Sequence, residues 1–297
     1  MLTFPPAAEG RYPLPLRQFM TKAKYNSINI FFITLVHVVA FGALFLFSWE
    51  NLAIALFGLF VLAPLGINVG YHRLLTHRAF VAPRWVMRSL ATLGAVIGAG
   101  PPLHWVAMHR VHHRYSDTEL DPHNATRGFW YSHMFHLFFQ DPHEAGEADY
   151  IRKYAPDLNA DPYLRWLNKS WLVLALLTLP ALYLVGGLGF MLWGGFVRIV
   201  LTWHVMWFVN SASHRWGYRN YETKDLTVNC WWVGILAAGE GWHNNHHANP
   251  SCAAHGHRWW EFDLSYMIIR GMEVFGLARN VKRPPSVKEM RVETVVS

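Results

Sequence analysis

The sequence predicts an all-α integral membrane protein, and its composition and its long apolar runs are the observations that predict it. Of its 297 residues, 53% are hydrophobic and only 15% are charged, whereas charged residues make up about 25% of a typical soluble domain. Aromatic residues reach 15% and include 15 tryptophans, a residue that concentrates where apolar and wet regions meet. This composition excludes a disordered chain and argues against an ordinary soluble enzyme.

The first predicted pair of membrane spans lies near the N-terminus, where residues 26–71 carry a single formal charge, Glu50. The run at about 29–49 is long enough to cross a bilayer as a helix. After a break at Glu50, a second span is predicted at about 52–70, shortened or kinked by Pro64. We expect these two spans to form a hairpin.

A second hairpin is predicted within residues 171–213, which again hold one charge, Arg198. Its spans lie at about 171–186 and 190–210, on either side of a glycine-rich turn. A further apolar stretch at 89–103 is short for a crossing and is interpreted as a helix lying in the membrane interface or dipping into it. Core helices of a large soluble protein are a weaker alternative, because such helices rarely reach twenty apolar residues.

The placement of lysine and arginine predicts the orientation in the membrane. The N-terminal arm, residues 1–25, carries four of them, the central segment 72–170 carries eleven, and the chain after His214 carries ten, whereas the inter-span turns carry none. Both termini and the central segment are therefore expected on the cytoplasmic side. Because such segments are basic anyway, the net charge of +7 gives no reason to expect nucleic acid as a partner. Residues 1–20 lack an apolar core, so no cleavable signal peptide is expected.

Histidine is the unusual residue of this chain, with 18 copies against two cysteines, which are too few for a disulfide framework or a cysteine zinc site. Two H-x-x-H-H motifs begin at His109 and His243. Positions i, i+3 and i+4 share a helix face, so each triplet should point three imidazoles at one place. An H-x-x-x-x-H pair begins at His72; its members are splayed by more than a quarter turn, so they could address different metals or lie partly off a regular helix. Asn210 and His214 share a face where the fourth span ends.

These motifs supply more imidazoles than one metal ion needs, so a two-metal site is predicted. The candidate ligands are His72, His77, His109, His112, His113, His214, His243, His246 and His247. Imidazole suits iron, zinc, copper and nickel, so the ligand type alone leaves the element open. His204, inside the fourth span, is a weaker candidate. The remaining histidines are interpreted as ordinary surface residues: His37, His104, His123, His133, His136, His143, His255 and His257.

At these motifs the sequence resembles the membrane fatty acid desaturases, specifically the group that introduces a double bond between carbons nine and ten of a saturated acyl chain. The resemblance covers about residues 25–284 and implies a desaturase domain over 26–284, followed by a C-terminal tail at 285–297. It is specific because the flanks match as well as the histidines. The matching segments are Gly70-Tyr-His-Arg-Leu-Leu-Thr-His77-Arg, Trp105-Val-Ala-Met-His109-Arg-Val-His-His113-Arg-Tyr-Ser-Asp117, Trp207-Phe-Val-Asn210-Ser-Ala-Ser-His214 and Gly239-Glu-Gly-Trp-His243-Asn-Asn-His-His247.

The resemblance implies a di-iron centre that the nine histidines hold in a cytoplasmic helical cap, with O2 as co-substrate. Asn210 would hold a metal-bound water, and Asp117, Glu119 and Asp121 would orient imidazole N–H groups, as carboxylates commonly do. Iron suits this chemistry because removing hydrogen from an unactivated methylene needs a redox-active metal, and zinc has no accessible redox change.

The implied activity is delta-9 desaturation of saturated acyl chains to cis-monounsaturated chains, with electrons from a separate donor such as a ferredoxin. The acyl carrier stays open between CoA and glycerolipid, since Ala107-Met108 stand where animal acyl-CoA members usually have a charged pair. Shape has to select the carbon atoms that react. Phe60 and Pro64, on the second span before His72, are candidates for the floor of a substrate tunnel, with simple helix packing as the alternative.

Two other functions remain open at this point. Membrane hydroxylases and ketolases carry similar histidine boxes, although the flanking residues favour desaturation, and the product would tell them apart. A membrane haem protein or metal transporter would need histidines that face each other within the spans. Only His37 and His204 lie in the apolar runs, so this second alternative is weak.

Overall fold

The computed structural model describes residues 24–140 and 146–284, and over these ranges the chain forms helices and isolated β-bridges, without a longer strand. The prediction of an all-α protein is thus confirmed. Three helical stretches are long and apolar enough to cross a membrane, at Ser27–Leu46, Trp49–Thr76 and Pro162–His214. The predicted tail, His143 and all but the last two residues of the N-terminal arm lie outside the described residues.

The helices are α2 (Ser27–Ala43), η1 (Leu44–Leu46), α3 (Trp49–Phe57), η2 (Gly58–Leu62), η3 (Pro64–Thr76), α4 (Arg84–Val96), α5 (Pro102–Tyr115), η4 (Ala125–Arg127), α6 (Phe129–His133), η5 (Phe135–Phe138), α7 (Glu147–Tyr154), α8 (Pro156–Asn159), α9 (Pro162–Phe190), η6 (Met191–Val197), α10 (Arg198–Ser211), η7 (Ala212–His214), α11 (Trp231–Leu236), α12 (His243–Ala248) and α13 (Leu264–Val274). Of the η elements, η2, η3 and η6 are π-helical and the others are 3-10 helices.

The turn between α2 and α3 comes slightly earlier than predicted. Phe47 is extended, and α3 begins at Trp49 rather than after Glu50. The reason is local: the Ser48 side chain accepts a hydrogen bond from the Asn51 N–H, at 3.1 Å, and so caps the helix. Glu50 then lies in the first helical turn, where a negative charge is favourable.

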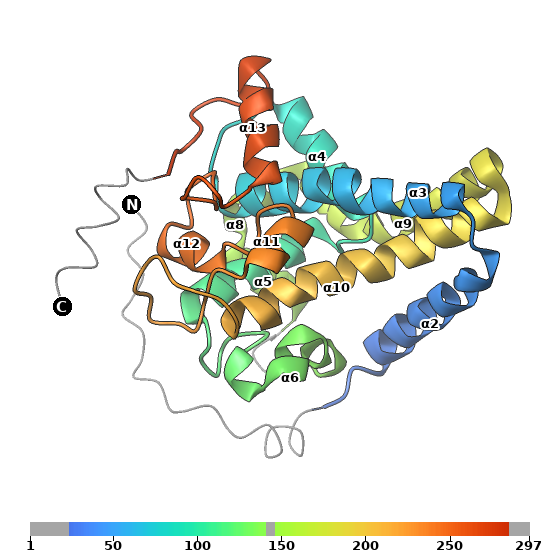
Figure 1. Ribbon diagram of the computed structural model, residues 1–297, viewed down its shortest axis with the longest axis horizontal. Coiled ribbons are helices and arrows are strands. Elements are labelled where there is room, and N and C mark those ends of the chain that lie inside the picture. Colours follow the sequence, from blue (N-terminus) through green and yellow to red (C-terminus); the bar gives the residue numbers. More distant parts are fainter. Residues whose placement is uncertain (1–23, 141–145, 285–297) are drawn as a thin grey trace.

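The last long stretch folds back on itself. The helix that contains the predicted third span begins at Pro162, because Asp161 caps it by accepting from the Tyr163 N–H. Gly186 and Gly187 have non-helical backbone angles, and Gly187 has φ +68°. Beyond them the chain returns along α9, so that a Cβ at Gly195 would lie 2.5 Å from Leu179 Cδ2. The returning segment η6 packs against α9, and α10 follows it; Figure 1 shows the turn at the right-hand end of these helices.

The prediction of a single interfacial helix at 89–103 is wrong. This stretch contains the end of α4, a turn and the start of α5. Gly98 and Gly100 both have positive φ angles, +85° and +97°, which end α4 and allow the chain to turn. Instead of lying alone, α4 packs against η3 so closely that a Cβ at Gly66 would lie 2.7 Å from the Gly94 backbone nitrogen.

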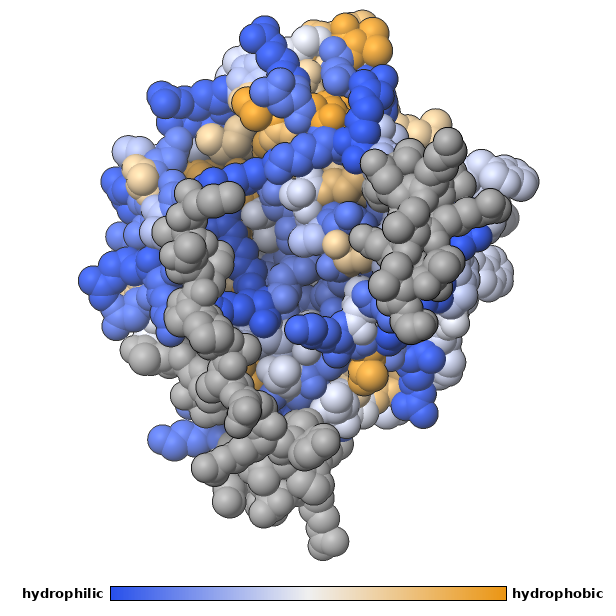
Figure 2. Space-filling model, turned by 90° about the vertical axis from the view of Figure 1, so that its left-hand side faces the viewer, coloured by the Kyte–Doolittle hydropathy of each residue, from blue (hydrophilic) through white to orange (hydrophobic). Residues whose placement is uncertain are grey.

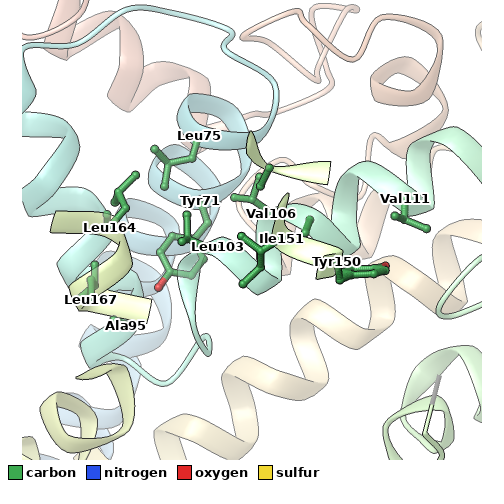
Figure 3. Packing of buried hydrophobic residues seen from close by; sticks show 13 residues of the cluster. Tyr71, Leu75, Ala95, Leu103, Val106, Val111, Tyr150, Ile151, Leu164 and Leu167 are labelled. Carbon is green, nitrogen blue, oxygen red and sulfur yellow. The ribbon is translucent and has the colours of Figure 1, made fainter. Parts of the chain in front are cut away.

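A hydrophobic cluster fixes the two elements that carry the first two histidine boxes. Figure 3 shows that its side chains come from η3, α4, α5, α7 and α9, with Tyr71 and Leu103 near the middle. Full burial of one such side chain contributes about 1.5–3 kcal/mol. The cluster therefore holds η3 against α5 independently of the histidines. Figure 1 shows α5, α11 and α12 gathered toward the left-hand ends of the long helices.

Candidate metal centre

The nine predicted histidines lie in two adjacent groups. In each group the potential ligand nitrogens all lie within 4.8 Å of one another. The five-histidine group consists of His72, His77, His109, His113 and His246. The four-histidine group consists of His112, His214, His243 and His247. Segments far apart in the sequence thus meet at both places.

The H-x-x-H-H triplets do not each point at one place, which corrects the prediction. His109 and His113 of α5 belong to the five-histidine group, whereas His112 belongs to the other. In α12 the division is reversed. His246 belongs to the five-histidine group, whereas His243 and His247 belong to the four-histidine group. The reason is helix geometry: consecutive residues point about 100° apart, so the adjacent i+3 and i+4 rings diverge. Each triplet therefore serves both groups.

His72 and His77 lie in the same group, with ring centroids 4.7 Å apart. On an α-helix their spacing would splay them. Here the chain is π-helical, and the His77 N–H donates to the His72 carbonyl at 3.1 Å. A hydrogen bond between residues i and i+5 brings these positions onto one face. Of the two readings of this pair, the departure from a regular α-helix is the correct one.

The nitrogen positions fit metal ions. Nε2 of His246 lies 3.0 Å from Nε2 of His72 and 2.9 Å from Nε2 of His113, and Nε2 of His112 lies 3.2 Å from Nε2 of His247. Two nitrogens bound at right angles to one metal, each at about 2.1 Å, would be about 3.0 Å apart. Within the described ranges, buried nitrogens of His77, His214 and His243 have no hydrogen-bond partner. A cation would satisfy them.

Burial keeps these rings neutral, as metal ligands must be. Burial, reinforced by the neighbouring imidazoles, holds the pKa values of His109, His113 and His246 well below the usual histidine value. The pKa values of His243 and His247 are lowered for the same reasons. Each of these rings therefore has a lone pair available at neutral pH.

Carboxylates accept hydrogen bonds from Nδ1 of four of the rings and so turn Nε2 toward the group. Two of these carboxylates were expected: Asp121 lies 3.0 Å from His112 Nδ1, and Asp117 lies 3.1 Å from His214 Nδ1. Glu119 is partly exposed and, within the described part of the chain, forms no hydrogen bond or ion pair with a histidine.

Two carboxylates of the same kind were missed. Glu240 lies 2.6 Å from His72 Nδ1, and Asp225 lies 2.7 Å from His247 Nδ1. Glu240 stands three residues before His243, inside a box that the sequence had already singled out. Asp225 lies in an irregular segment between two helices with no motif around it, so no signal in the sequence could have found it.

A buried ion-pair network supports Glu240. Arg73 is fully buried and contacts Glu240 and Asp263, each at 3.0 Å. Asp263 also caps α13 by accepting from the Tyr266 N–H. Burial alone would raise the pKa of Glu240, but His255 and Arg73 outweigh it and hold that pKa well below its usual value. The last helix is thereby tied to the histidine groups.

Several histidines expected on the surface are buried instead, which corrects that interpretation. His255 lies 3.1 Å from Glu240, and His123 lies 3.8 Å from Asp121. The others are His133, His136 and His257. They are buried because each lies among aromatic rings or beside a polar partner of the interior. His37 and His104 are partly buried.

His204 lies outside both groups. Its Nε2 faces His37 Nε2 at 3.1 Å, and its Nδ1 faces His133 Nε2 at 3.0 Å. His133 in turn contacts the Ser211 hydroxyl at 2.9 Å. Both ring nitrogens of His204 are thus engaged by other side chains.

The other predicted site residues lie on the long helices. Asn210 is half-buried at the end of α10, four residues before His214. Pro64 is buried at the start of η3, whereas Phe60 in η2 is 38% exposed.

Fold and site together define a class, namely helical proteins with membrane-length apolar helices and two adjacent histidine groups that could hold metal ions. The comparison with known families identifies the family within this class. The family model described as fatty acid desaturase matches residues 47–273, and the chain belongs to this family of oxidoreductases. The resemblance found in the histidine boxes is confirmed.

Individual relatives agree over most of the chain. An sn-1 stearoyl-lipid 9-desaturase of Anabaena variabilis is 42% identical over 268 residues, covering 88% of this chain and 96% of the relative. An sn-2 palmitoyl-lipid 9-desaturase of Nostoc sp. (strain 36) is 42% identical over 259 residues, covering 87% and 90%. An acyl-CoA 5-desaturase of Anemone leveillei is 40% identical over 271 residues, covering 90% and 84%.

Proposed function

We propose that this chain is an O2-dependent delta-9 desaturase that converts saturated acyl chains into cis-monounsaturated chains. The observation that carries the proposal is the convergence of nine imidazoles, five of them buried and four partly buried, in two adjacent groups. The 9-desaturases among the relatives support the position of the double bond. In the overall reaction one –CH2–CH2– unit, O2, two electrons and two protons become –CH=CH– and two waters.

We assign one iron ion to each histidine group, with the nine histidines as ligands. Iron bound there supplies the redox chemistry that activates O2. The protein's own contribution is to hold the ligands in place: Asp117, Asp121, Asp225 and Glu240 fix the Nδ1–H side of their rings. Asn210 is assigned to a metal-bound water, since it stands at the end of α10, four residues before His214. Burial of the site excludes bulk water and limits side reactions.

The membrane topology we propose has four spans in two hairpins. The fold-back at Gly187 divides the third long stretch into two antiparallel crossings. The arm, the central segment 72–170 and the chain after His214 then face the cytoplasm, and the metal centre lies in a cytoplasmic helical cap. Figure 2 supports this assignment, because the face at the left-hand side of Figure 1 carries mostly hydrophilic residues.

The substrate we propose is an acyl glycerolipid, with the acyl chain bent past the metals in an apolar tunnel whose floor includes Phe60 and Pro64. The two relatives with 42% identity are named for lipid-bound stearoyl and palmitoyl chains, whereas the relative from Anemone is named for acyl-CoA. Electrons come from a separate soluble donor with an acidic surface, such as a ferredoxin.

The test uses purified protein, loaded with ferrous iron in lipid nanodiscs and reduced through ferredoxin. Distearoyl glycerolipid is compared with stearoyl-CoA, and products are identified by gas chromatography and mass spectrometry. We expect an oleoyl lipid that forms only with O2, and no product from His246→Ala. Product from stearoyl-CoA alone would reassign the carrier. An alcohol or ketone in place of the alkene would overturn the proposed reaction.

A further inference from the structure

The two histidine groups differ in the charge placed behind them. In the four-histidine group three of the four rings have a carboxylate on Nδ1, at 3.0, 3.1 and 2.7 Å. In the five-histidine group, among the residues that the structure describes, only His72 has such a carboxylate partner, Glu240. The group with fewer imidazoles therefore has more negative charge around it.

Arginine increases this difference. Arg73 pairs with Glu240 at 3.0 Å and offsets its charge. Among the residues that the structure describes, no lysine or arginine side chain pairs with Asp117, Asp121 or Asp225. Backbone N–H groups also donate to these carboxylates, from Leu226 to Asp117 at 2.8 Å and from His123 to Asp121 at 3.1 Å.

This arrangement favours a more highly charged metal at one position. A carboxylate on the far nitrogen makes an imidazole a more basic ligand. Buried negative charge also attracts a trivalent ion more strongly than a divalent one, and the attraction falls with distance. Both effects act most strongly on the four-histidine position, because the carboxylates there are bonded to its own ligands.

We propose that the two metal positions are redox-inequivalent, and that loss of one electron from the di-ferrous centre leaves the ferric ion at the four-histidine position. The inference rests on the proposed function, since it takes two irons as given. It assigns to Asp117, Asp121 and Asp225 the role of positioning residues. They lower the reduction potential of the iron at the four-histidine position, which is the iron oxidised first.

The test is oxidation of 57Fe-loaded protein by an outer-sphere one-electron oxidant, ferricyanide, which takes one electron from one ferrous ion and becomes ferrocyanide. Mössbauer and electron paramagnetic resonance spectra follow the mixed-valence form and give two reduction potentials. Asp225→Asn keeps an acceptor for the His247 N–H but removes a negative charge. It should therefore raise the lower of the two reduction potentials and narrow the difference between them. Glu240→Gln should raise the higher potential and widen the gap. We expect each variant to weaken ferric relative to ferrous binding at its own position by about tenfold or more.

Asp117→Asn is a second variant for the four-histidine position and should act in the same direction as Asp225→Asn. Asp161→Asn is the matched control: it removes a carboxylate that caps α9 and pairs with Arg88, without contact to a histidine. Asparagine caps helices as well as aspartate does, so both potentials should stay unchanged.

The inference is overturned if Asp225→Asn and Asp117→Asn raise the higher potential, or if all variants shift both potentials equally. The proposed function fails by a different observation, namely wild-type protein that binds fewer than two irons per chain or forms no alkene. Two irons and normal product with equal potentials would refute this inference alone.

Discussion

At the scale of single residues, burial decides what each histidine can do. His37, His204 and His133 form a row of hydrogen bonds between α2, α10 and α6. Polar groups in an apolar region need partners, and side-chain hydrogen bonds between membrane helices typically contribute about 0.6 kcal/mol each. Because this row uses both nitrogens of His204, we expect it to hold helices together rather than bind metal.

His204→Ala should therefore retain two irons per chain and clear activity, although α2 should be held less firmly. His113→Ala and His246→Ala should abolish product while the protein still inserts into the membrane. Iron analysis and product assays on the three variants would compare their metal content and their activity. A folded, fully metallated His204→Ala protein without activity would contradict the assignment.

Asn210→Ala should lower activity while most of the iron remains. The reason is that Asn210 is proposed to hold a bound water and not a metal directly, so its loss loosens the water without removing a ligand. Elemental analysis beside the turnover rate separates the two effects. Loss of one iron per chain on this substitution would show that Asn210 is itself a ligand.

At the scale of the elements, the sequence predicted which helices exist better than where they turn. Apolar length was enough to predict the long helices. The residues at which α3 and α9 begin depend on hydrogen-bonded caps at Ser48 and Asp161. The candidate ligands could be listed because imidazole clusters are rare in sequence. Their division into two groups could not, since it depends on the π-helix that joins His72 to His77 and on divergent neighbours in α5. The contact of Asp225 with His247 is long-range and leaves no local pattern.

The contact between η3 and α4 is close enough to test. A Cβ at Gly94 would lie 2.5 Å from Tyr71 Cε1, next to His72. Gly94→Ala should lower the free energy of unfolding by about 1–3 kcal/mol, as overpacked cores do, and should weaken iron retention. The matched control is Gly42→Ala, where a Cβ meets nothing within 4 Å. Thermal unfolding and iron content in detergent would measure both, and equal effects would contradict the packing argument.

Phe60 tests the proposed tunnel. It stands twelve residues before His72 on the same long helical stretch. If its ring closes the tunnel, Phe60→Ala should accept longer acyl chains while the double bond keeps its distance from the carboxyl end. Product analysis with acyl chains of increasing length measures this. A moved double bond with unchanged length preference would exclude Phe60 from the floor.

At the scale of the whole molecule, the basic residues lie almost entirely outside the proposed spans. Of the 26 lysines and arginines, only Arg198 lies within a proposed span. The membrane's positive-inside bias accounts for part of this distribution. In the topology that we propose, the other lysines and arginines lie on the side from which a soluble electron donor would reach the metal centre. Complementary charge mainly accelerates the encounter of two such proteins.

Reduction by an acidic ferredoxin should therefore slow steeply as salt is added. The Debye length is about 8 Å at physiological ionic strength and shrinks as salt is added, so the attraction between the two proteins is screened. Activity driven by a small chemical reductant should change little. Stopped-flow reduction across a salt series would compare them. Equal salt sensitivity with both reductants would indicate damage to the protein or membrane and remove the case for electrostatic docking.

The contribution of α12 to both groups has a consequence for biosynthesis. A ribosome makes this helix after all the long helices, so neither group is complete while they are being inserted. Before α12 exists, the five-histidine group already has His72, His77, His109 and His113, whereas the four-histidine group has only His112 and His214. We expect nascent chains arrested before residue 243 to capture one metal ion at most, at the five-histidine position. The second ion then enters only after translation has passed the last box, which makes filling of the four-histidine position the final step in maturation of the enzyme.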